Sequence, residues 1–239
     1  MPNLKLKEPL SEMKDKKISS KISLKNSRLF PVEDSIFAKG TGMIAVKTPI
    51  NKKVGNLGRK AFTILEYLSE AEALTTSALS NLMGYYRYDV KGALKSLVST
   101  GLVREIEVAT SLGIFKLWVK SDIKLPQNAQ EACRLAALGL FYAWAKKEVP
   151  NFEWSLLKIK KKPVMAEMTF LPKGQMNRIK WLIDVPRRGE KPHPNANIFI
   201  FPTLAEGKSL APQGKRFTCD LLLMVNDGAD LSQKIFEVS

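Results

Sequence analysis

The chain has 239 residues, and its 38 Lys and Arg against 23 Asp and Glu leave a net charge of +15. A cationic surplus of this size favours a polyanionic partner, because neutralised phosphates release counterions, and nucleic acid is the partner that we expect. An anionic membrane surface is the competing partner. One histidine and two cysteines exclude a zinc site of the usual Cys/His kind.

Neither a membrane helix nor a secretory signal is expected. No apolar run approaches the length that a bilayer requires, and the Lys-rich N-terminus lacks the apolar segment of a signal peptide. The two cysteines, Cys133 and Cys219, lie far apart and are expected to be reduced thiols. These features predict a cytoplasmic protein with no membrane partner.

Residues 1–57 are expected to form a basic arm that is only partly ordered. Residues 1–60 hold fourteen Lys and Arg against five Asp and Glu, and sustained periodicity is missing. Such an arm either lies along a duplex, where salt would screen its contribution, or serves only to solubilise the protein. The apolar stretch 43–46 is a candidate for an extra strand on the domain that follows.

A helical pattern begins at residue 58 and predicts three helices. The first has an apolar face of Phe62, Ile64, Leu65 and Leu68. Thr75 and Thr76 offer an N-cap to the second helix, and the third runs from Tyr86 to Thr100, with Gly101 at its end. Two β-like runs, 102–108 and 114–119, follow around a short turn. Three helices and a hairpin predict a winged helix-turn-helix over residues 58–122.

The start of the third predicted helix carries large polar-tipped side chains in a row, at positions 85–88. In a helix-turn-helix this leading turn reaches base edges and phosphates in the major groove. Arginine suits bidentate contact with guanine, and tyrosine hydroxyls suit phosphate oxygens. Lys91 and Lys95 continue a cationic ridge along the same helix. The opposite side of the helix is a packing face formed by Val90, Leu94 and Leu97. The candidate DNA-binding residues are Arg59, Lys60, Tyr85, Tyr86, Arg87, Tyr88, Lys91, Lys95, Thr110, Ser111 and Lys116.

A resemblance to known regulators covers about residues 58–120. The stretch LTTSALSNLMGYYRYDVKGALKSLVSTGLVREI looks like the winged helix-turn-helix of MarR- and ArsR-type proteins. The overall order is similar to the replication-relaxation proteins of Gram-positive plasmids and conjugative elements, in which a nuclease-like sheet domain follows. The resemblance implies sequence-specific binding of double-stranded DNA that regulates transcription or replication on a plasmid, phage or other mobile element. Symmetric dimers are common among such DNA-binding proteins, so the chain is expected to be either a monomer or a homodimer.

Residues 123–239 are expected to form a helix plus an α/β sheet domain, which makes the whole chain α+β. The helix, 126–147, has a face of small residues that packs within the chain or on a second copy. Turn clusters at 186–192 and 211–216 separate the strands, and solvent exposure is favoured for Arg187 and Arg188. The predicted strands are 154–159, 164–171, 181–185, 198–201, 221–225 and 234–238.

The last residues, FTCDLLLMVNDGADLSQKIFEVS, resemble the metal-binding hairpin of PD-(D/E)xK nucleases. In that family an Asp at the start of one strand and a Glu on the next hold Mg²⁺, and a nearby Lys assists the attacking water. The resemblance places the acids at Asp220 and Glu237, but Ser239 stands at the lysine position and Cys219 replaces the proline. A degenerate restriction-endonuclease-like fold, a chain truncated within a longer protein, and an unrelated sheet domain are all open.

The sequence therefore predicts a double-stranded DNA-binding protein that uses no cofactor. A nuclease that uses Asp220, Glu237 and Mg²⁺ is the second interpretation. A third makes the winged helix an assembly module that binds protein partners.

Overall fold

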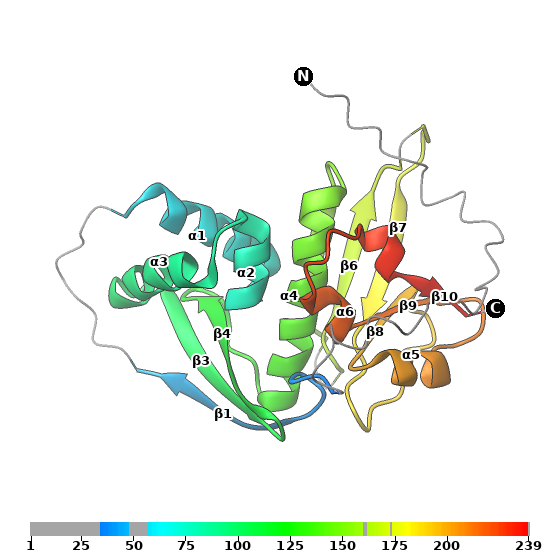
Figure 1. The fold of residues 1–239 in the computed structure, drawn as a ribbon, viewed down its shortest axis with the longest axis horizontal. Helices are drawn as coiled ribbons and strands as arrows, with labels where there is room; N and C mark the ends of the chain where they lie inside the picture. The colour runs from blue at the N-terminus through cyan, green and yellow to red at the C-terminus, as the bar shows by residue number, and fades with distance from the viewer. Residues whose placement is uncertain (1–33, 48–56, 160–161, 173, 239) are drawn as a thin grey trace.

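The structure, a computed structural model, describes residues 34–47, 57–159, 162–172 and 174–238. In these residues the chain is an α+β protein with two separate sheets and six α-helices (Figure 1). The long helix α4, Ala129–Glu148, stands between the two sheets (Figure 1). Most of the predicted basic arm, 1–33 and 48–56, lies outside the described residues.

Three helices come before the hairpin, at Arg59–Ala71 (α1), Thr76–Met83 (α2) and Arg87–Ser99 (α3). The predicted cap of α2 is confirmed, because the Thr75 side chain accepts a hydrogen bond from the Ala78 N–H at 3.2 Å. The predicted apolar face of α1 is wrong at Phe62, whose side chain is 54% exposed. The buried stripe starts one residue earlier and keeps the spacing of a single helix face. Its members are Ala61, Ile64, Leu68 and Ala71.

The first sheet has the strand order β1-β3-β4-β2, and each neighbouring pair is antiparallel. Its strands are Gly40–Val46 (β1), Ala73–Thr75 (β2), Val103–Thr110 (β3) and Gly113–Lys120 (β4). The predicted hairpin is confirmed, with longer strands and a tighter turn than expected. The strand predicted at 43–46 is also confirmed, as part of β1. β2 was not predicted, since three residues are too few for a periodicity to show.

Residues 34–40 lead into β1 and pack against both β4 and α4. The ring of Phe37 lies edge-on to Phe115 of β4, with ring centres 4.7 Å apart. A Cβ on Gly40 would lie 2.4 Å from the backbone carbon and oxygen of Ala129. Because backbone atoms cannot give way as a flexible side chain can, only glycine permits this approach of β1 to α4.

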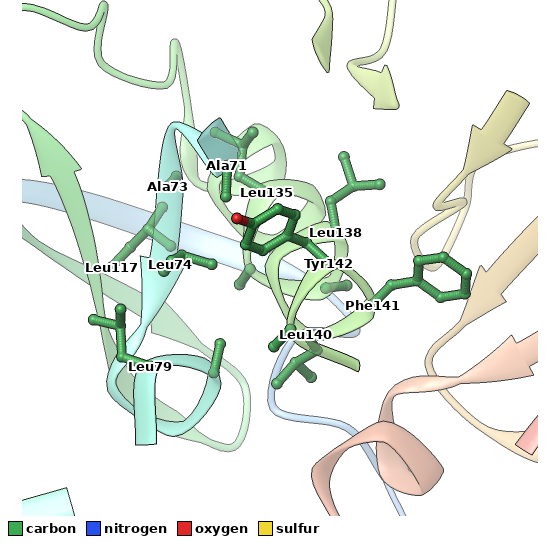
Figure 2. Packing of buried hydrophobic residues seen from close by; sticks show 14 of the residues in the cluster. Ala71, Ala73, Leu74, Leu79, Leu117, Leu135, Leu138, Leu140, Phe141 and Tyr142 are labelled. Carbon is green, nitrogen blue, oxygen red and sulfur yellow. The ribbon is translucent and has the colours of Figure 1, made fainter. Parts of the chain in front are cut away.

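Helix α4 is buried around its whole circumference over residues 132–145, and not only on the predicted small-residue face. It contacts α2, β1 and β2 on one side and β6 (Met165–Phe170) and α6 (Asp220–Met224) on the other. In Figure 2 Leu135 lies towards Ala71 and Ala73, whereas Phe141 points away to the other side. One apolar core therefore runs from α1–α3 through α4 to the second sheet. Neither α4 nor any other helix in the described ranges has the apolar length that a bilayer crossing requires.

The second sheet has the strand order β10-β9-β8-β7-β6-β5. Strands β5, β6 and β7 are antiparallel neighbours, β8 and β9 run parallel to β7, and β10 is antiparallel to β9. The strands are Glu153–Leu157 (β5), Met165–Phe170 (β6), Ile179–Asp184 (β7), Ile198–Phe201 (β8), Arg216–Cys219 (β9) and Phe236–Glu237 (β10). The first four predicted strands of this half are thus confirmed, with ends that differ by a few residues.

The predictions for the last part of the chain need correction. The run 221–225 is not a strand but belongs to helix α6, Asp220–Met224, because a short leucine-rich run fits either state and its length cannot decide. The predicted strand 234–238 shrinks to β10, behind the 3-10 helix Leu231–Lys234. Helix α5, Leu204–Leu210, and strand β9 were not predicted.

Both cysteines are buried free thiols. Burial raises the pKa of the Cys133 thiol and that of the Cys219 thiol to about 12. Both side chains are therefore protonated at neutral pH and act as small apolar groups in the core. This agrees with the reduced state predicted from the sequence.

Candidate nucleic-acid interface

Helix α3 has one buried face and one exposed face. Val90, Leu94 and Leu97 are buried against the core. On the other face Tyr88 is 86% exposed, and Lys91 and Lys95 follow it towards the solvent one and two turns later. The separation between a packing face and an outward face, predicted from the spacing alone, is confirmed as a matter of exposure.

The turn between α2 and α3 is held by backbone geometry and one side chain. Gly84 has a φ of 64°, in the left-handed region that glycine adopts without strain. The Ser80 hydroxyl donates a hydrogen bond to the Tyr85 carbonyl oxygen at 2.5 Å. Tyr86 is the N-cap residue of α3, and its side chain is 85% exposed. The turn therefore presents Tyr86 and Arg87 to the solvent on a fixed backbone.

The first turn of α1 lies beside the first turn of α3. The Lys60 Nζ is 4.3 Å from the centre of the Tyr85 ring and 3.8 Å from the Asp89 carboxylate. Arg59 is exposed next to it. The structure thus brings Lys60 beside Tyr85 at the start of α3, although the charge of Lys60 is partly compensated.

The hairpin residues predicted to touch DNA lie at a different place. Thr110 and Ser111 are at the turn of the β3–β4 hairpin, at the end of the first sheet that is remote from α3 (Figure 1). Lys116 of β4 forms ion pairs with Glu105 and Glu107 of β3. The hydrogen bond to Glu105 raises the pKa of Lys116, so this lysine stays charged but its charge is compensated. Its charge is therefore less available to an anion than that of a lysine without an ion pair.

The cations of α3 are among the exposed cations of the described residues that form no ion pair. Arg87, Lys91 and Lys95 form no ion pair with a carboxylate in the part of the chain that the structure describes. Lys146 and Lys158, by contrast, pair with Glu70 and Glu72. An uncompensated cation gains most from a phosphate, because no internal bond has to break.

The two acids predicted by the nuclease resemblance are not brought into a common site. The Asp220 side chain is fully buried at the start of α6, whereas Glu237 is exposed on β10 and lies 3.5 Å from the Arg216 Nε. No group of three or more His, Cys, Asp or Glu side chains within residues 34–47, 57–159, 162–172 and 174–238 could hold a metal ion. Ser239, at the expected lysine position, lies outside these residues.

Asp220 instead pairs with Arg187, which corrects the expected solvent exposure of that arginine. The Arg187 Nη1 is 2.6 Å from the Asp220 Oδ2, and both side chains are fully buried. The Ser35 hydroxyl donates to the same oxygen at 2.6 Å, and the Arg187 Nη2 donates to the Ile200 carbonyl at 2.6 Å. Burial raises the pKa of Asp220, and the adjacent guanidinium acts against this shift. The neighbouring Arg188 is exposed, as predicted, and pairs with acids at the surface.

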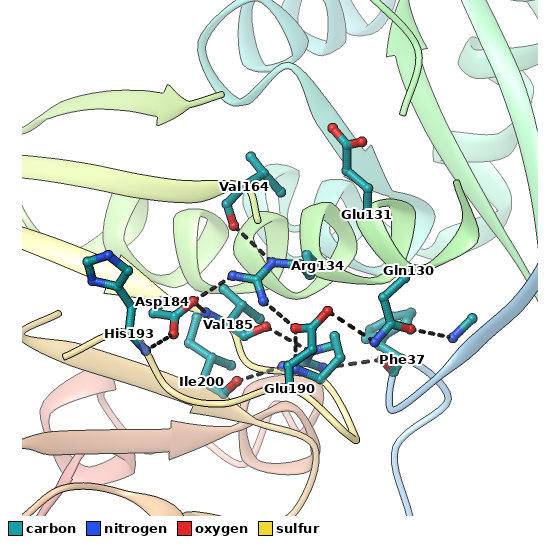
Figure 3. Close-up of polar contacts among 12 residues, drawn as sticks. Phe37, Gln130, Glu131, Arg134, Val164, Asp184, Val185, Glu190, His193 and Ile200 are labelled. Atoms are coloured by element: carbon teal, nitrogen blue, oxygen red, sulfur yellow. Dashed lines mark hydrogen bonds and ion pairs between the residues drawn. The ribbon is translucent and has the colours of Figure 1, made fainter. Parts of the chain in front are cut away.

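A second buried arginine completes a polar layer between α4 and the second sheet. Figure 3 shows Arg134 of α4 between Asp184 and Glu190, and its Nε donates to the Val164 carbonyl at 3.0 Å. Asp184 also accepts a hydrogen bond from the backbone N–H of His193 at 2.8 Å, so the only histidine lies at a structural turn. Sequence reasoning missed this layer, although one arginine in the alanine-rich stretch of α4 was a usable signal, because a charge on a buried helix needs a partner.

No family model, curated protein or solved structure matches the chain. The function must therefore be inferred from the side chains around α3.

Proposed function

We propose that residues 58–122 form a winged helix-turn-helix that binds double-stranded DNA with α3 in the major groove. The order α1-β2-α2-α3-β3-β4, with β4 between β2 and β3, supports this assignment. So does the size of α3, because the major groove admits one α-helix. The observation that carries the proposal is the exposed, uncompensated face of α3 behind a leading turn of tyrosines and an arginine.

Each residue of this face has an expected role. Arg87 reads a base edge, because a guanidinium donates two parallel hydrogen bonds to guanine. Tyr86 and Tyr88 bind phosphate oxygens through their hydroxyl groups. Lys91 and Lys95, four residues apart on one ridge, neutralise phosphates along the same strand. The resemblance to replication-relaxation proteins favours regulation of replication or transcription on a mobile element, by a monomer or by a homodimer that binds a symmetric site.

DNA cleavage is not part of the proposal. Asp220 is occupied by Arg187 and Ser35 inside the core and does not face the solvent. The exposed features of the winged helix are explained equally well by duplex binding, so no observation favours an assembly role.

Replacing Arg87 and replacing Lys91 should have different effects. Arg87→Ala is expected to cost about 1–3 kcal/mol at the preferred sequence and to relax the choice of base at one position. Lys91→Ala should weaken all duplexes alike and lower the salt slope, the change in log K per log salt, by about 1. Selection of bound duplexes from a random pool, followed by anisotropy titrations over a range of salt, measures both effects.

The control for both variants is Lys208→Ala, which removes an exposed lysine from α5 in the other half of the molecule. It should retain the wild-type sequence preference and salt slope. Wild-type affinity, preference and salt slope in both α3 variants would show that α3 does not contact the duplex.

A further inference from the structure

A groove of about 520 Å³ opens beside the α2–α3 turn. Helices α2 and α6 lie on either side of α4, and α4 forms its floor (Figure 1). Tyr86 and Arg87 are among its lining residues, so the groove adjoins the leading turn of α3 described above. From the other elements its lining includes Ser77, Asn81, Trp144, Lys147, Met224 and Asn226. We refer to it as the α2–α6 groove.

The charge of this groove has one sign. Its charged lining residues are Arg87 and Lys147, and no carboxylate of the residues that the structure describes lines it. The Lys147 Nζ donates to the Asn81 Oδ1 at 3.0 Å and lies 5.5 Å from the centre of the Trp144 ring. Both partners are neutral, and Lys147 forms no ion pair with a carboxylate of the described residues. The groove is therefore complementary to an anion.

The adjacent lysine provides an internal contrast. Lys146 lies 2.6 Å from the Glu70 carboxylate on the α1 side of α4, and its charge is compensated. Lys147 is one residue further along, about 100° around the helix. The two lysines are alike in chemistry and position along the chain, but Lys147, and not Lys146, lines the α2–α6 groove and is free of an ion pair within the described residues.

The polar groups of the groove suit a phosphate. Asn81 uses its side-chain oxygen to accept from Lys147, which leaves its amide N–H groups to donate to a ligand. Ser77 and Asn226, two further uncharged polar residues, line the same space. The apolar floor offers little to an apolar ligand, because Leu140, Trp144 and Leu223 are already buried by their own neighbours. A hydrophilic, extended anion fits these features better than an apolar small molecule.

We infer that the α2–α6 groove binds the sugar–phosphate backbone of the duplex whose major groove α3 enters. Lys147 neutralises one phosphate, and the Asn81 amide donates to it. The inference rests on the proposed function and adds α4 to the interface. Because α4 is also packed against the second sheet, the contact fixes that half of the molecule relative to the DNA axis.

The test is a fluorescence anisotropy titration of a fluorescein-labelled duplex of mixed sequence by the full chain over a range of salt. Lys147→Ala should weaken binding about three- to tenfold at low salt and lower the salt slope by about 0.9, the value for one phosphate. Asn81→Asp, which is nearly isosteric, should have a similar effect because its carboxylate compensates Lys147. The two changes combined should be less than additive, since they disable one phosphate contact.

Lys146→Ala is the matched control and should keep the wild-type salt slope. Lys147→Arg should keep it as well, because the charge remains. Thermal unfolding of each variant checks that the fold is retained, as expected because none of the substituted side chains belongs to the buried core.

Two outcomes separate this inference from the proposed function. If Lys91→Ala lowers the salt slope but Lys147→Ala and Asn81→Asp do not, α3 binds DNA and the α2–α6 groove does not. If the wild-type chain does not bind the duplex even at low salt, both proposals are overturned.

Discussion

Replacing Arg187 by methionine should lower the free energy of unfolding by about 3–5 kcal/mol, because it leaves the Asp220 carboxyl buried without its ionic partner. Asp220 has no exposed surface, and the Ser35 hydroxyl alone cannot replace a guanidinium. Arg187 also donates to the Ile200 carbonyl, which would lose that bond. Urea unfolding followed by circular dichroism measures the loss, provided that the transition stays two-state.

The loss should depend on pH. Burial raises the pKa of Asp220, and Arg187 acts against this shift, so removing the arginine should raise the pKa further. A carboxyl group whose pKa is higher in the folded than in the unfolded state takes up a proton on folding, which favours the folded state at low pH. Arg187→Met should therefore recover part of the lost stability as the pH falls through the folded-state pKa of Asp220, and lose it again as the pH rises.

The chain offers a matched control at the next position. Arg188→Met removes an exposed arginine that pairs with Asp34 and Glu206, and it should cost no more than about 1 kcal/mol. The double variant Arg187→Met/Asp220→Leu should be more stable than Arg187→Met alone, because no unpaired charge remains in the core. Equal losses for Arg187→Met and Arg188→Met would contradict the buried pair.

Reversing the charge of both lysines on α3 should nearly abolish DNA binding. Lys91→Glu/Lys95→Glu removes two phosphate contacts and places two carboxylates against the backbone, so a loss of about a hundredfold or more is expected at low salt. Both side chains are exposed, and the packing face of α3 is untouched, so the unfolding transition should change little. Anisotropy titration against a duplex of mixed sequence measures the loss.

A change in the net charge of the protein could by itself weaken binding, so the control variant must change the net charge by the same amount. Lys191→Glu/Lys208→Glu does so at two exposed lysines near the second sheet. This variant should lose severalfold at most, because the charges lie beyond the reach of the duplex and salt screens them. A similar loss in both double variants would mean that overall charge, and not α3, governs binding.

The sequence predicted best where one face of an element is buried and the other exposed. In α3 the spacing of Val90, Leu94 and Leu97 was sufficient to predict both the helix and the outward direction of Tyr88 and Lys91, because a period of 3.6 residues fixes which side chains share a face. The hairpin β3–β4 could be predicted for the same reason, from the alternation of its strands.

The sequence predicted least where an element is buried on all sides or where charged residues far apart in the chain form ion pairs. Helix α4 is buried on all sides, so its amphipathic pattern indicated only one of several packing faces. The leucines of α6 carry no period that distinguishes five helical residues from a strand. Arg187 gave no local sign of burial, because its partner Asp220 is 33 residues away in the sequence. A long-range partner of this kind cannot be identified from the neighbours of either residue.

The candidate interface shows the same division. Exposure of the turn 85–88 follows from local pattern, whereas the compensation of Lys60 and Lys116 by acids on other elements does not. Lys147 was not among the predicted residues, because only the packing of α4 against α2 and α6 brings it beside the turn.

The central claim is that the outward face of α3 touches DNA, and photo-crosslinking tests it most directly. A benzophenone-bearing phenylalanine at position 88, where the tyrosine side chain is 86% exposed, should crosslink to a bound duplex on irradiation. The same group at position 210, an exposed leucine on α5, should not. A duplex that binds with unchanged affinity but crosslinks at position 210 and not at position 88 would contradict the claim.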